Sequence, residues 1–209
     1  MKPKDSTLEA AVRLQFVTLV DVAHWTWTEG LLADGLPMRL YLAERDGKLW
    51  SAGFSDGVHP RTEDEFEWRL GKETRWRRCG SEATDSETLQ NAVKQVNEYF
   101  AGRRQAFDLP LALRGTTFQL RVWEELTAIP FGGKKTYGDI AEAVGLPTAF
   151  RAVGNANGRN NLPLFVPCHR VLAAGGKLGG YTGGLGLKSR LLAHEAAVSA
   201  AGARAMSFT

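Results

Sequence analysis

Residues 136–157, TYGDIAEAVGLPTAFRAVGNAN, predict two short helices joined by a tight turn. Thr136 is suited to cap the first helix with Asp139 in its first turn, and Gly145 can end that helix in the left-handed conformation. Pro147 suits the first turn of the second helix, which we expect to run to about residue 157. This pattern is the outline of a helix-turn-helix.

The second helix is unusual for a reader of the major groove, because most of its side chains are small. Arg151 is its one long charged side chain. Small residues allow close approach to a DNA groove, and a single guanidinium can fill the position that an extruded base leaves. The alternative is an ordinary amphipathic helix pair with a solvated arginine.

Further along the chain, residues 167–171 read PCHRV and follow the apolar run 162–166. We expect that run to be a buried strand or extended segment that, with Pro167, fixes Cys168 at a defined turn. A thiol with a pKa near ~8.5 needs a base or a positive potential to act as a nucleophile. His169 is the candidate base, and transfer through a water is favoured because adjacent side chains on an extended backbone diverge. The alternative for Cys168 is a buried structural cysteine.

A carboxylate near the C-terminus is also expected to point inward. Leu187, Leu191 and Glu195 recur at i, i+4 and i+8 of the terminal helix, so they share one face. A buried carboxylate needs a hydrogen-bonding or charged partner. The alternative is an exposed glutamate at a helix end.

The segments TYGDIAEAVG, RAVGNANGRN, PCHRV, GGYTGGL and LLAHE, in this order between residues 117 and 196, resemble the O6-alkylguanine-DNA alkyltransferase family. That resemblance implies a DNA-repair protein that takes an alkyl group from the base once per molecule. It implies that Cys168 accepts the group, that His169 takes the thiol proton through a water, and that Glu195 polarises this histidine. The damaged DNA is then the alkyl donor, so no cofactor is expected.

The resemblance also implies roles for residues around the cysteine. Asn160 matches the asparagine that holds the active-site turn, although it can equally be a helix-terminating residue. Tyr137 matches the tyrosine that donates a proton to the departing guanine, although a tyrosine at a helix start is often a packing residue. Tyr181 and Thr182 match the loop that forms one wall of the base pocket.

The remaining implied contacts are with the substrate. Backbone groups around Val171 are expected to read the guanine edge, while Arg151, Ala152 and Asn157 contact DNA or the extruded base. The expected partner is double-stranded DNA that contains O6-alkylguanine, with O4-alkylthymine as a second lesion. We expect minor-groove contact with little sequence specificity, and a monomeric protein.

Charge is distributed unevenly along the 209 residues, whose net charge is +3. Residues 116–195 contain nine Lys or Arg and five Asp or Glu, a net of +4, which leaves −1 for the rest. The half that carries the motifs is therefore the basic half. This mild excess suits weak, sequence-independent phosphate contact.

Several classes of site and location are disfavoured by the sequence. No run of eighteen apolar residues occurs, and the apolar stretch 14–20 has no cleavage pattern behind it, so we expect a cytoplasmic protein without membrane contact. His24, His59 and Cys79 are widely separated, so we expect no metal. Cys79 is interpreted as incidental, and both cysteines as reduced. The glycine-rich residues 175–186 lack the spacing of a phosphate-binding loop.

The N-terminal half contains a hairpin signal. Residues 38–43 and 48–54 predict two strands around a turn at Asp46 and Gly47. A helix over residues 87–101 is predicted from one apolar face and from Ser86 as its cap; that face comprises Leu89, Val93, Val96 and Phe100. The charged stretch 58–85 predicts loop and surface.

A domain boundary is expected around residues 109–115. After it, Thr116 and Gln119 can form the capping box of a helix whose apolar residues are Phe118, Val122, Trp123 and Leu126. The expected fold class is α+β. We expect residues 1–112 to form an N-terminal structural α/β domain with a small antiparallel sheet, as in the family. Residues 113–209 should form a mostly helical domain that carries the helix-turn-helix and the active-site cysteine.

Other functions remain open. A helix-turn-helix regulator would explain the DNA features without chemistry, but the second helix lacks base-reading side chains. A lesion-binding alkyltransferase-like protein shares this scaffold, but such proteins replace the cysteine that is present here as Cys168. A cysteine hydrolase is disfavoured because its usual local signatures are absent.

Overall fold

A computed structural model describes residues 22–55, 63–70, 74–80 and 86–206. The apolar stretch 14–20, His59 and part of the stretch 58–85 lie outside these ranges. Among the described residues, no helix is both long and apolar enough to cross a membrane. Nor do these residues contain a group of three or more His, Cys, Asp or Glu that could hold a metal ion.

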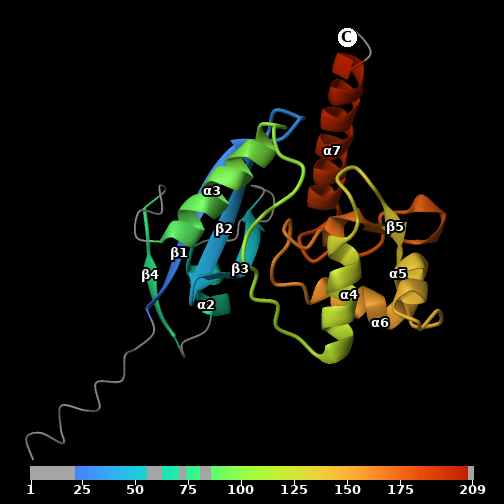
Figure 1. Ribbon diagram of the computed structural model, residues 1–209, viewed down its shortest axis with the longest axis horizontal. Coiled ribbons are helices and arrows are strands. Elements are labelled where there is room, and N and C mark those ends of the chain that lie inside the picture. Colours follow the sequence, from blue (N-terminus) through green and yellow to red (C-terminus); the bar gives the residue numbers. More distant parts are fainter. Residues whose placement is uncertain (1–21, 56–62, 71–73, 81–85, 207–209) are drawn as a thin grey trace, which may run out of the picture.

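The N-terminal half is built on a four-stranded sheet (Figure 1). Its strands are β1 (Val22–Leu31), β2 (Pro37–Arg45), β3 (Lys48–Ser55) and β4 (Arg75–Arg78), in the order β3-β2-β1-β4. The predicted hairpin is confirmed, since β2 and β3 pair antiparallel around Asp46 and Gly47, which have φ angles of 54° and 70°. These positive φ angles are the reason that an Asp-Gly pair suits the turn.

The expected small antiparallel sheet is confirmed for β1, β2 and β3, and is wrong only for β4, which pairs parallel with β1. The prediction of loop over residues 58–85 was also wrong in part, since this stretch contains helix α2 (Glu63–Leu70) as well as β4. A parallel pair requires a crossover, and α2 lies on the path from β3 to β4. Both elements are short and rich in charge, so they carry little apolar periodicity.

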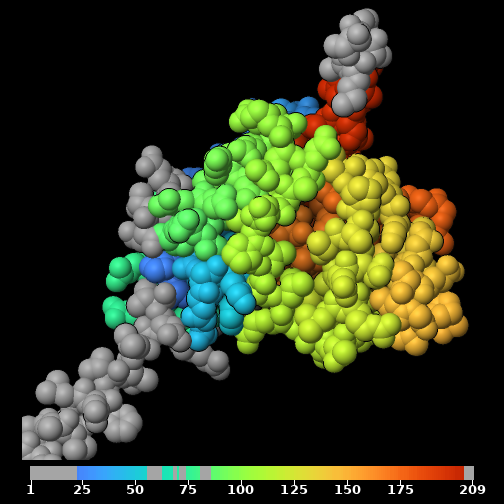
Figure 2. All heavy atoms as spheres, viewed as in Figure 1, coloured from blue at the N-terminus to red at the C-terminus, as the bar shows by residue number. Residues whose placement is uncertain are grey.

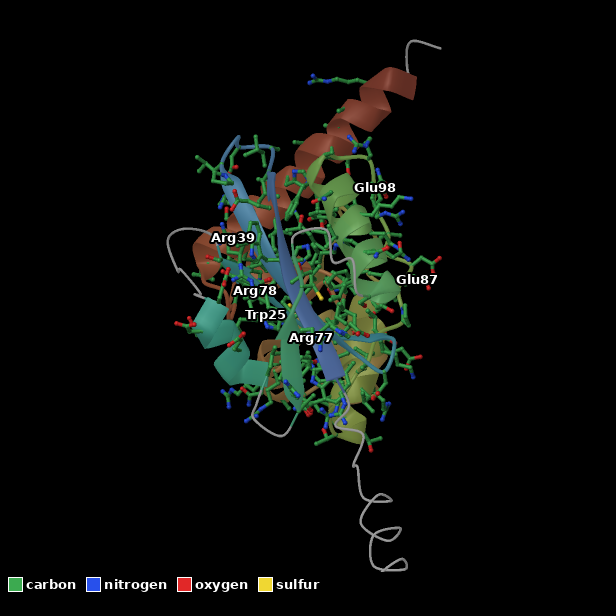
Figure 3. All side chains as sticks on the ribbon, turned by 90° about the vertical axis from the view of Figure 1, so that its left-hand side faces the viewer. Trp25, Arg39, Arg77, Arg78, Glu87 and Glu98 are labelled. Carbon is green, nitrogen blue, oxygen red and sulfur yellow. The ribbon has the colours of Figure 1, made fainter. Side chains whose placement is uncertain are left out.

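The sheet is covered on both faces. Met38, Leu40 and Leu42 share the main core with helix α3 (Glu87–Phe100), whereas Trp25 and Tyr41 pack with Phe66 of α2. Alternate residues of a strand point to opposite faces of the sheet. This explains why some strand residues pack with α3 and others with α2. Viewed from the β1 and β4 side, α2 lies on one side of the strands and α3 on the other (Figure 3).

Helix α3 agrees with its prediction. Ser86 is its N-cap and accepts a hydrogen bond from the backbone N–H of Leu89. Leu89, Val96 and Phe100 are buried and Val93 is partly buried. The helix also buries Tyr99, which the predicted apolar face did not include.

The C-terminal half is mostly helical, as expected. Its helices are α4 (Thr117–Thr127), α5 (Tyr137–Ala143), α6 (Phe150–Gly158) and α7 (Leu185–Met206). The capping box of Thr116 and Gln119 is present on α4, and Thr136 caps α5 in the same way with Asp139. Gly145 follows α5 with a φ of 75°, as predicted.

Two local predictions in this half were wrong. Helix α6 begins at Phe150 rather than at Pro147, because Ala149 donates to the carbonyl of Leu146 and closes a separate turn before the helix. The apolar run 162–166 is buried but forms a turn, in which Val166 donates to the carbonyl of Leu162 and Leu164 has a φ of 78°. Apolar composition alone does not separate a buried strand from a buried turn.

The two halves are joined along the edge of the sheet. The N–H of Leu49 donates to Pro110 at 2.8 Å, and the N–H of Ala52 donates to Asn161 at 2.8 Å. Strand β3 is an edge strand, so these bonds satisfy backbone groups that would otherwise be unpaired. The connector from α3 to α4 runs over the surface between the two halves (Figure 2). One cluster of buried side chains extends through both halves.

Candidate active site

Cys168 lies on a short 3-10 turn, Cys168–Arg170, and is 4% exposed. Its Sγ is 3.1 Å from Nδ2 of Asn160. The same amide donates to the carbonyl of Val166 at 2.8 Å, and Oδ1 of Asn160 accepts from the N–H of Leu162 at 2.9 Å. Asn160 therefore holds both the turn before the cysteine and the thiol itself.

His169 and Glu195 form a buried pair behind the cysteine. Nε2 of His169 lies 2.8 Å from Oε1 of Glu195, and neither residue is exposed. An ionised carboxylate only accepts hydrogen bonds, so Nε2 carries the proton and Nδ1 is the acceptor nitrogen. Nδ1 is buried and has no hydrogen-bond partner among the described residues. This nitrogen is available to take a proton.

Glu195 lies on the predicted inward face of α7, with Leu187 and Leu191 also buried. Beyond His169, it accepts hydrogen bonds from the guanidinium of Arg170 at 3.0 Å, from the Tyr99 hydroxyl at 3.1 Å and from the N–H of Gly132 at 3.0 Å. The carboxylate thus has the partners that its burial requires.

The environment sets the protonation states of these groups. Burial raises the pKa of Cys168, and this outweighs the opposing effects of Asn160, the Tyr181 hydroxyl and the charge of Lys188. Burial lowers the pKa of His169 against the opposing effect of Glu195. Burial raises the pKa of Glu195, but hydrogen bonds and charge from His169 and Arg170 lower it to about 2. At neutral pH the resting site therefore holds a protonated thiol, a neutral imidazole and an ionised carboxylate.

A fully buried lysine also lies near the cysteine. Lys188 donates to the carbonyls of Val171 and Leu178, and its Nζ is 5.9 Å from the centre of the Tyr137 ring. Burial lowers the pKa of Lys188 to about 8, with the Cys168 charge acting in the opposite direction. This contact ties strand β6 (Val171–Leu172) to the loop before α7. The Val171 carbonyl, one of the expected base-reading groups, is therefore already engaged by Lys188.

An open cleft of about 710 Å³ lies beside this network. Its lining includes Tyr137, Phe150, Arg151, Gly154, Asn157 and Tyr181. The Tyr137 hydroxyl donates to the carbonyl of Gly180 at 3.1 Å, and the Thr182 hydroxyl donates to that of Gly158 at 3.0 Å. These bonds hold the loop before α7 against the two helices of the helix-turn-helix. Burial and the Cys168 charge raise the pKa of Tyr137, so its hydroxyl keeps its proton at neutral pH.

The three α6 residues expected to contact DNA differ in their exposure and in whether they line the cleft. Arg151 is exposed on α6 and borders the cleft. Ala152 is exposed on the same helix but does not line the cleft. Asn157 is 4% exposed, and its Nδ2 is 3.4 Å from the carbonyl of Cys168. It therefore borders both the cleft and the cysteine rather than the open surface.

Comparisons with known proteins agree with this arrangement. The model of the 6-O-methylguanine DNA methyltransferase DNA-binding domain matches residues 117–197, and that of the ribonuclease-like domain of the same family matches residues 39–113. A methylated-DNA–protein-cysteine methyltransferase of Mycobacterium tuberculosis is 52% identical over 111 residues, which cover 53% of this chain and 67% of that protein. This chain belongs to the 6-O-methylguanine DNA methyltransferase family.

Other members of the family support the same assignment. The constitutive methylated-DNA–protein-cysteine methyltransferase of Bacillus subtilis is 52% identical over 103 residues, covering 49% of this chain and 62% of that protein. A crystal structure of Mycobacterium tuberculosis OGT in complex with DNA matches with a TM-score of 0.65 and 37% identity, covering 84% of this chain and 94% of that one. The likeness to the solved structure therefore extends over both halves of the protein.

Four residues of the site were missed by the sequence reasoning: Phe54, Tyr99, Arg170 and Lys188. Arg170 stands inside the PCHRV motif, and Tyr99 follows Val96 by three residues on the buried side of α3, so both had a usable signal. Lys188 had none, because a lysine beside the Leu187 stripe ordinarily lies in solvent. Phe54 lines a small cavity beside Cys168, and it could not be found either, because its place there depends on how the sheet docks.

Proposed function

We propose that this protein repairs O6-alkylguanine in duplex DNA by transferring the alkyl group irreversibly to Cys168, once per molecule. The observation that carries the proposal is the buried thiol in a cavity that shares Asn157, Tyr181 and Thr182 with the open cleft. Behind the thiol stand a neutral histidine and an ionised glutamate. Such an arrangement provides a nucleophile, a base and an orienting group for the base.

The proposed transfer begins with removal of the thiol proton. Nδ1 of His169 takes it through a bridging water, and Glu195 stabilises the imidazolium that forms. The thiolate then attacks the alkyl carbon, so that the Sγ–C bond forms as the C–O6 bond breaks and its electron pair passes to the guanine. Burial raises the pKa of Cys168 in the resting protein, so the thiol is protonated at neutral pH and needs the base His169 to become a nucleophile.

The leaving guanine must also gain a proton. We assign this step to Tyr137, which lines the cleft and keeps its hydroxyl proton at neutral pH. The tyrosine is then reprotonated by the proton that left Cys168, so the net change is a thioether and an unmodified guanine. A phenol in this position lowers the barrier by neutralising charge that develops on the base.

The proposed partner is double-stranded DNA. The protein contacts its minor groove and has little preference for the base sequence. Helix α6 presents Arg151 and small residues at the cleft, which suits extrusion of a base rather than reading of base edges. O4-alkylthymine is included as a second lesion. Within this proposal the protein acts as a cytoplasmic monomer, residues 1–112 form a structural domain, and residues 113–209 carry DNA binding and transfer.

The test is to mix the protein with a duplex that carries one O6-methylguanine labelled in the methyl group. Label should accumulate on Cys168 to at most one equivalent, and Cys168→Ala should bind the duplex without transfer. Cys79→Ala is the matched control, because Cys79 is also buried and is not part of a disulfide, and it should be dispensable for transfer. Several turnovers per molecule, or label on Cys79, would contradict the mechanism. Binding of the lesion without transfer by the unaltered protein would favour a lesion-binding role.

A further inference from the structure

A small cavity of about 30 Å³ lies against Cys168. Its walls include Phe54, Asn160, Pro163, Tyr181 and Gly183. Phe54 belongs to β3, so the N-terminal sheet supplies one wall of a cavity whose other walls come from the C-terminal half. The N-terminal half is therefore in direct contact with the space in front of the nucleophile.

Phe54 is held firmly in this position. It is 6% exposed, and its strand pairs antiparallel with β2 through the backbone. Two residues before it, Ala52 donates to the carbonyl of Asn161, and the Asn161 side chain donates to the carbonyl of Trp50 at 2.9 Å. The strand is thus bonded directly to the turn that precedes Cys168. Because both the strand and the turn are packed, the backbone that carries Phe54 cannot move away from the cavity without breaking these bonds.

The size of the cavity limits what can reach the thiol. A single water-sized group needs about 10–15 Å³ of such space. The cavity therefore has room for a methyl group or slightly more, but not for an aromatic ring.

We infer that Phe54 is a specificity-determining residue that restricts this protein to small alkyl groups. The inference rests on the proposed alkyl transfer, and it assigns the cavity at Cys168 to the alkyl group itself. The cleft beside it takes the base. Removing the Phe54 ring would enlarge the cavity that Phe54 shares with Cys168, so that a group as large as benzyl can reach the sulfur.

The experiment compares two duplexes that differ only in carrying O6-methylguanine or O6-benzylguanine. Second-order rate constants are measured for the unaltered protein, Phe54→Leu, Phe54→Ala and Leu40→Ala. Leu40 is the matched control, because it is a buried core residue of the same sheet that does not line the cavity. In Phe54→Ala the ratio of benzyl to methyl rate constants should rise at least about tenfold, as for other changes of pocket size. Phe54→Leu should give a smaller rise and Leu40→Ala none.

The outcomes separate this inference from the function on which it rests. Methyl transfer by the unaltered protein with an unchanged ratio in both Phe54 variants would overturn the role of Phe54 and leave the function standing. An equal rise in Leu40→Ala would overturn it too, because loosening of the sheet would then explain the effect. Absence of methyl transfer in the unaltered protein would overturn both. Should Phe54→Ala fail to fold, Phe54→Leu retains the test, since its ratio must still exceed that of the unaltered protein.

Discussion

Glu195 is the residue at which the polar contacts of the site converge. His169, Arg170, Tyr99 and the backbone of Gly132 all donate to its carboxylate. The bond from Nε2 of His169 fixes the tautomer in which Nδ1 accepts a proton. In the proposed mechanism, the charge of the carboxylate also stabilises the imidazolium that forms when the thiol loses its proton.

Replacing Glu195 with Gln should therefore slow transfer by on the order of 100-fold or more. The glutamine cannot stabilise an imidazolium, so the apparent pKa of Cys168 should rise and the rate-pH profile should move to higher pH. The measurement is the transfer rate from the free nucleoside O6-methyl-2′-deoxyguanosine across a pH series. An unchanged profile would show that His169 works without this carboxylate.

Arg151 offers a test that separates base extrusion from chemistry. Extruding a base costs a few kcal/mol of stacking and pairing, and an inserted guanidinium offsets part of this cost. Arg151→Ala should therefore slow repair of duplex DNA about tenfold or more, while its reaction with the free nucleoside should change little. The two rate constants are measured in one preparation.

Arg159→Ala serves as the control for this change, because Arg159 is exposed at the end of the same helix but does not line the cleft. It should leave both rate constants near those of the unaltered protein. Equal losses on duplex and nucleoside in Arg151→Ala would mean that Arg151 supports the fold or the thiolate instead.

At the scale of elements, the helix-turn-helix depends on the turn at Gly145. This residue has a φ of 75°, which is costly for any residue with a Cβ. The surrounding space is open, since a Cβ there would lie 4.0 Å from its nearest neighbour, on Arg121. Any effect of substitution should therefore come from backbone strain and not from a clash.

Gly145→Ala is expected to lower the free energy of unfolding by about 1–2 kcal/mol. Gly186→Ala is the comparison, because Gly186 lies within α7, has open space around it and lacks a positive φ. Alanine there should be neutral or stabilising, since it favours helix. Urea denaturation of both variants gives the two values. A neutral Gly145→Ala would show that the turn tolerates a rearranged backbone.

The elements also show what could be predicted from the sequence. Capping at Thr116 and Thr136, the Asp46-Gly47 turn and the inward stripe of α7 follow from local rules, and all were found. The parallel strand β4 was not predicted because it depends on long-range pairing with β1. The start of α6 and the turn at 162–166 were not predicted because proline and apolar residues occur both in regular elements and in the tight turns found there. The same reasoning applies to the site: Cys168, His169 and Glu195 were marked by motif and periodicity, whereas Lys188 and Phe54 depend on docking of separate elements.

At the scale of the whole molecule, the N-terminal half contacts the residues to which we assign the transfer. Tyr99 reaches Glu195 from α3, its carbonyl lies 3.0 Å from Nε2 of His194, and Arg190 pairs with Asp34 at 2.6 Å. Phe54 adds the cavity wall. The N-terminal half was expected to be structural. Because of these contacts, a shift of its sheet would change the shape of the site.

The shifted pKa values of Glu195 and His169 predict how the stability of the molecule depends on pH. The folded pKa of Glu195, about 2, is depressed from an ordinary value of 4.5. The stabilisation is therefore fully present above about pH 4.5 and is lost as the pH falls toward 2. His169 acts in the same direction at higher pH, because its pKa is lowered from 6.5 and the unfolded chain binds the proton first. The free energy of unfolding should thus decline from pH 7 to pH 3.

Glu195→Gln tests this account at the level of the molecule. The variant leaves the buried guanidinium of Arg170 uncompensated, so at pH 7 it should be less stable by about 3–5 kcal/mol. Its free energy of unfolding should also fall less steeply than that of the unaltered protein between pH 4.5 and 3, because the titrating carboxylate is gone.

Glu98→Gln is the control, since Glu98 lies on the outer side of α3 (Figure 3) and its pair with Arg104 is partly exposed. It should follow the unaltered curve closely, because surface ion pairs contribute little. Urea denaturation at each pH supplies the curves, and parallel acid limbs for Glu195→Gln and the unaltered protein would show that other carboxylates govern acid unfolding.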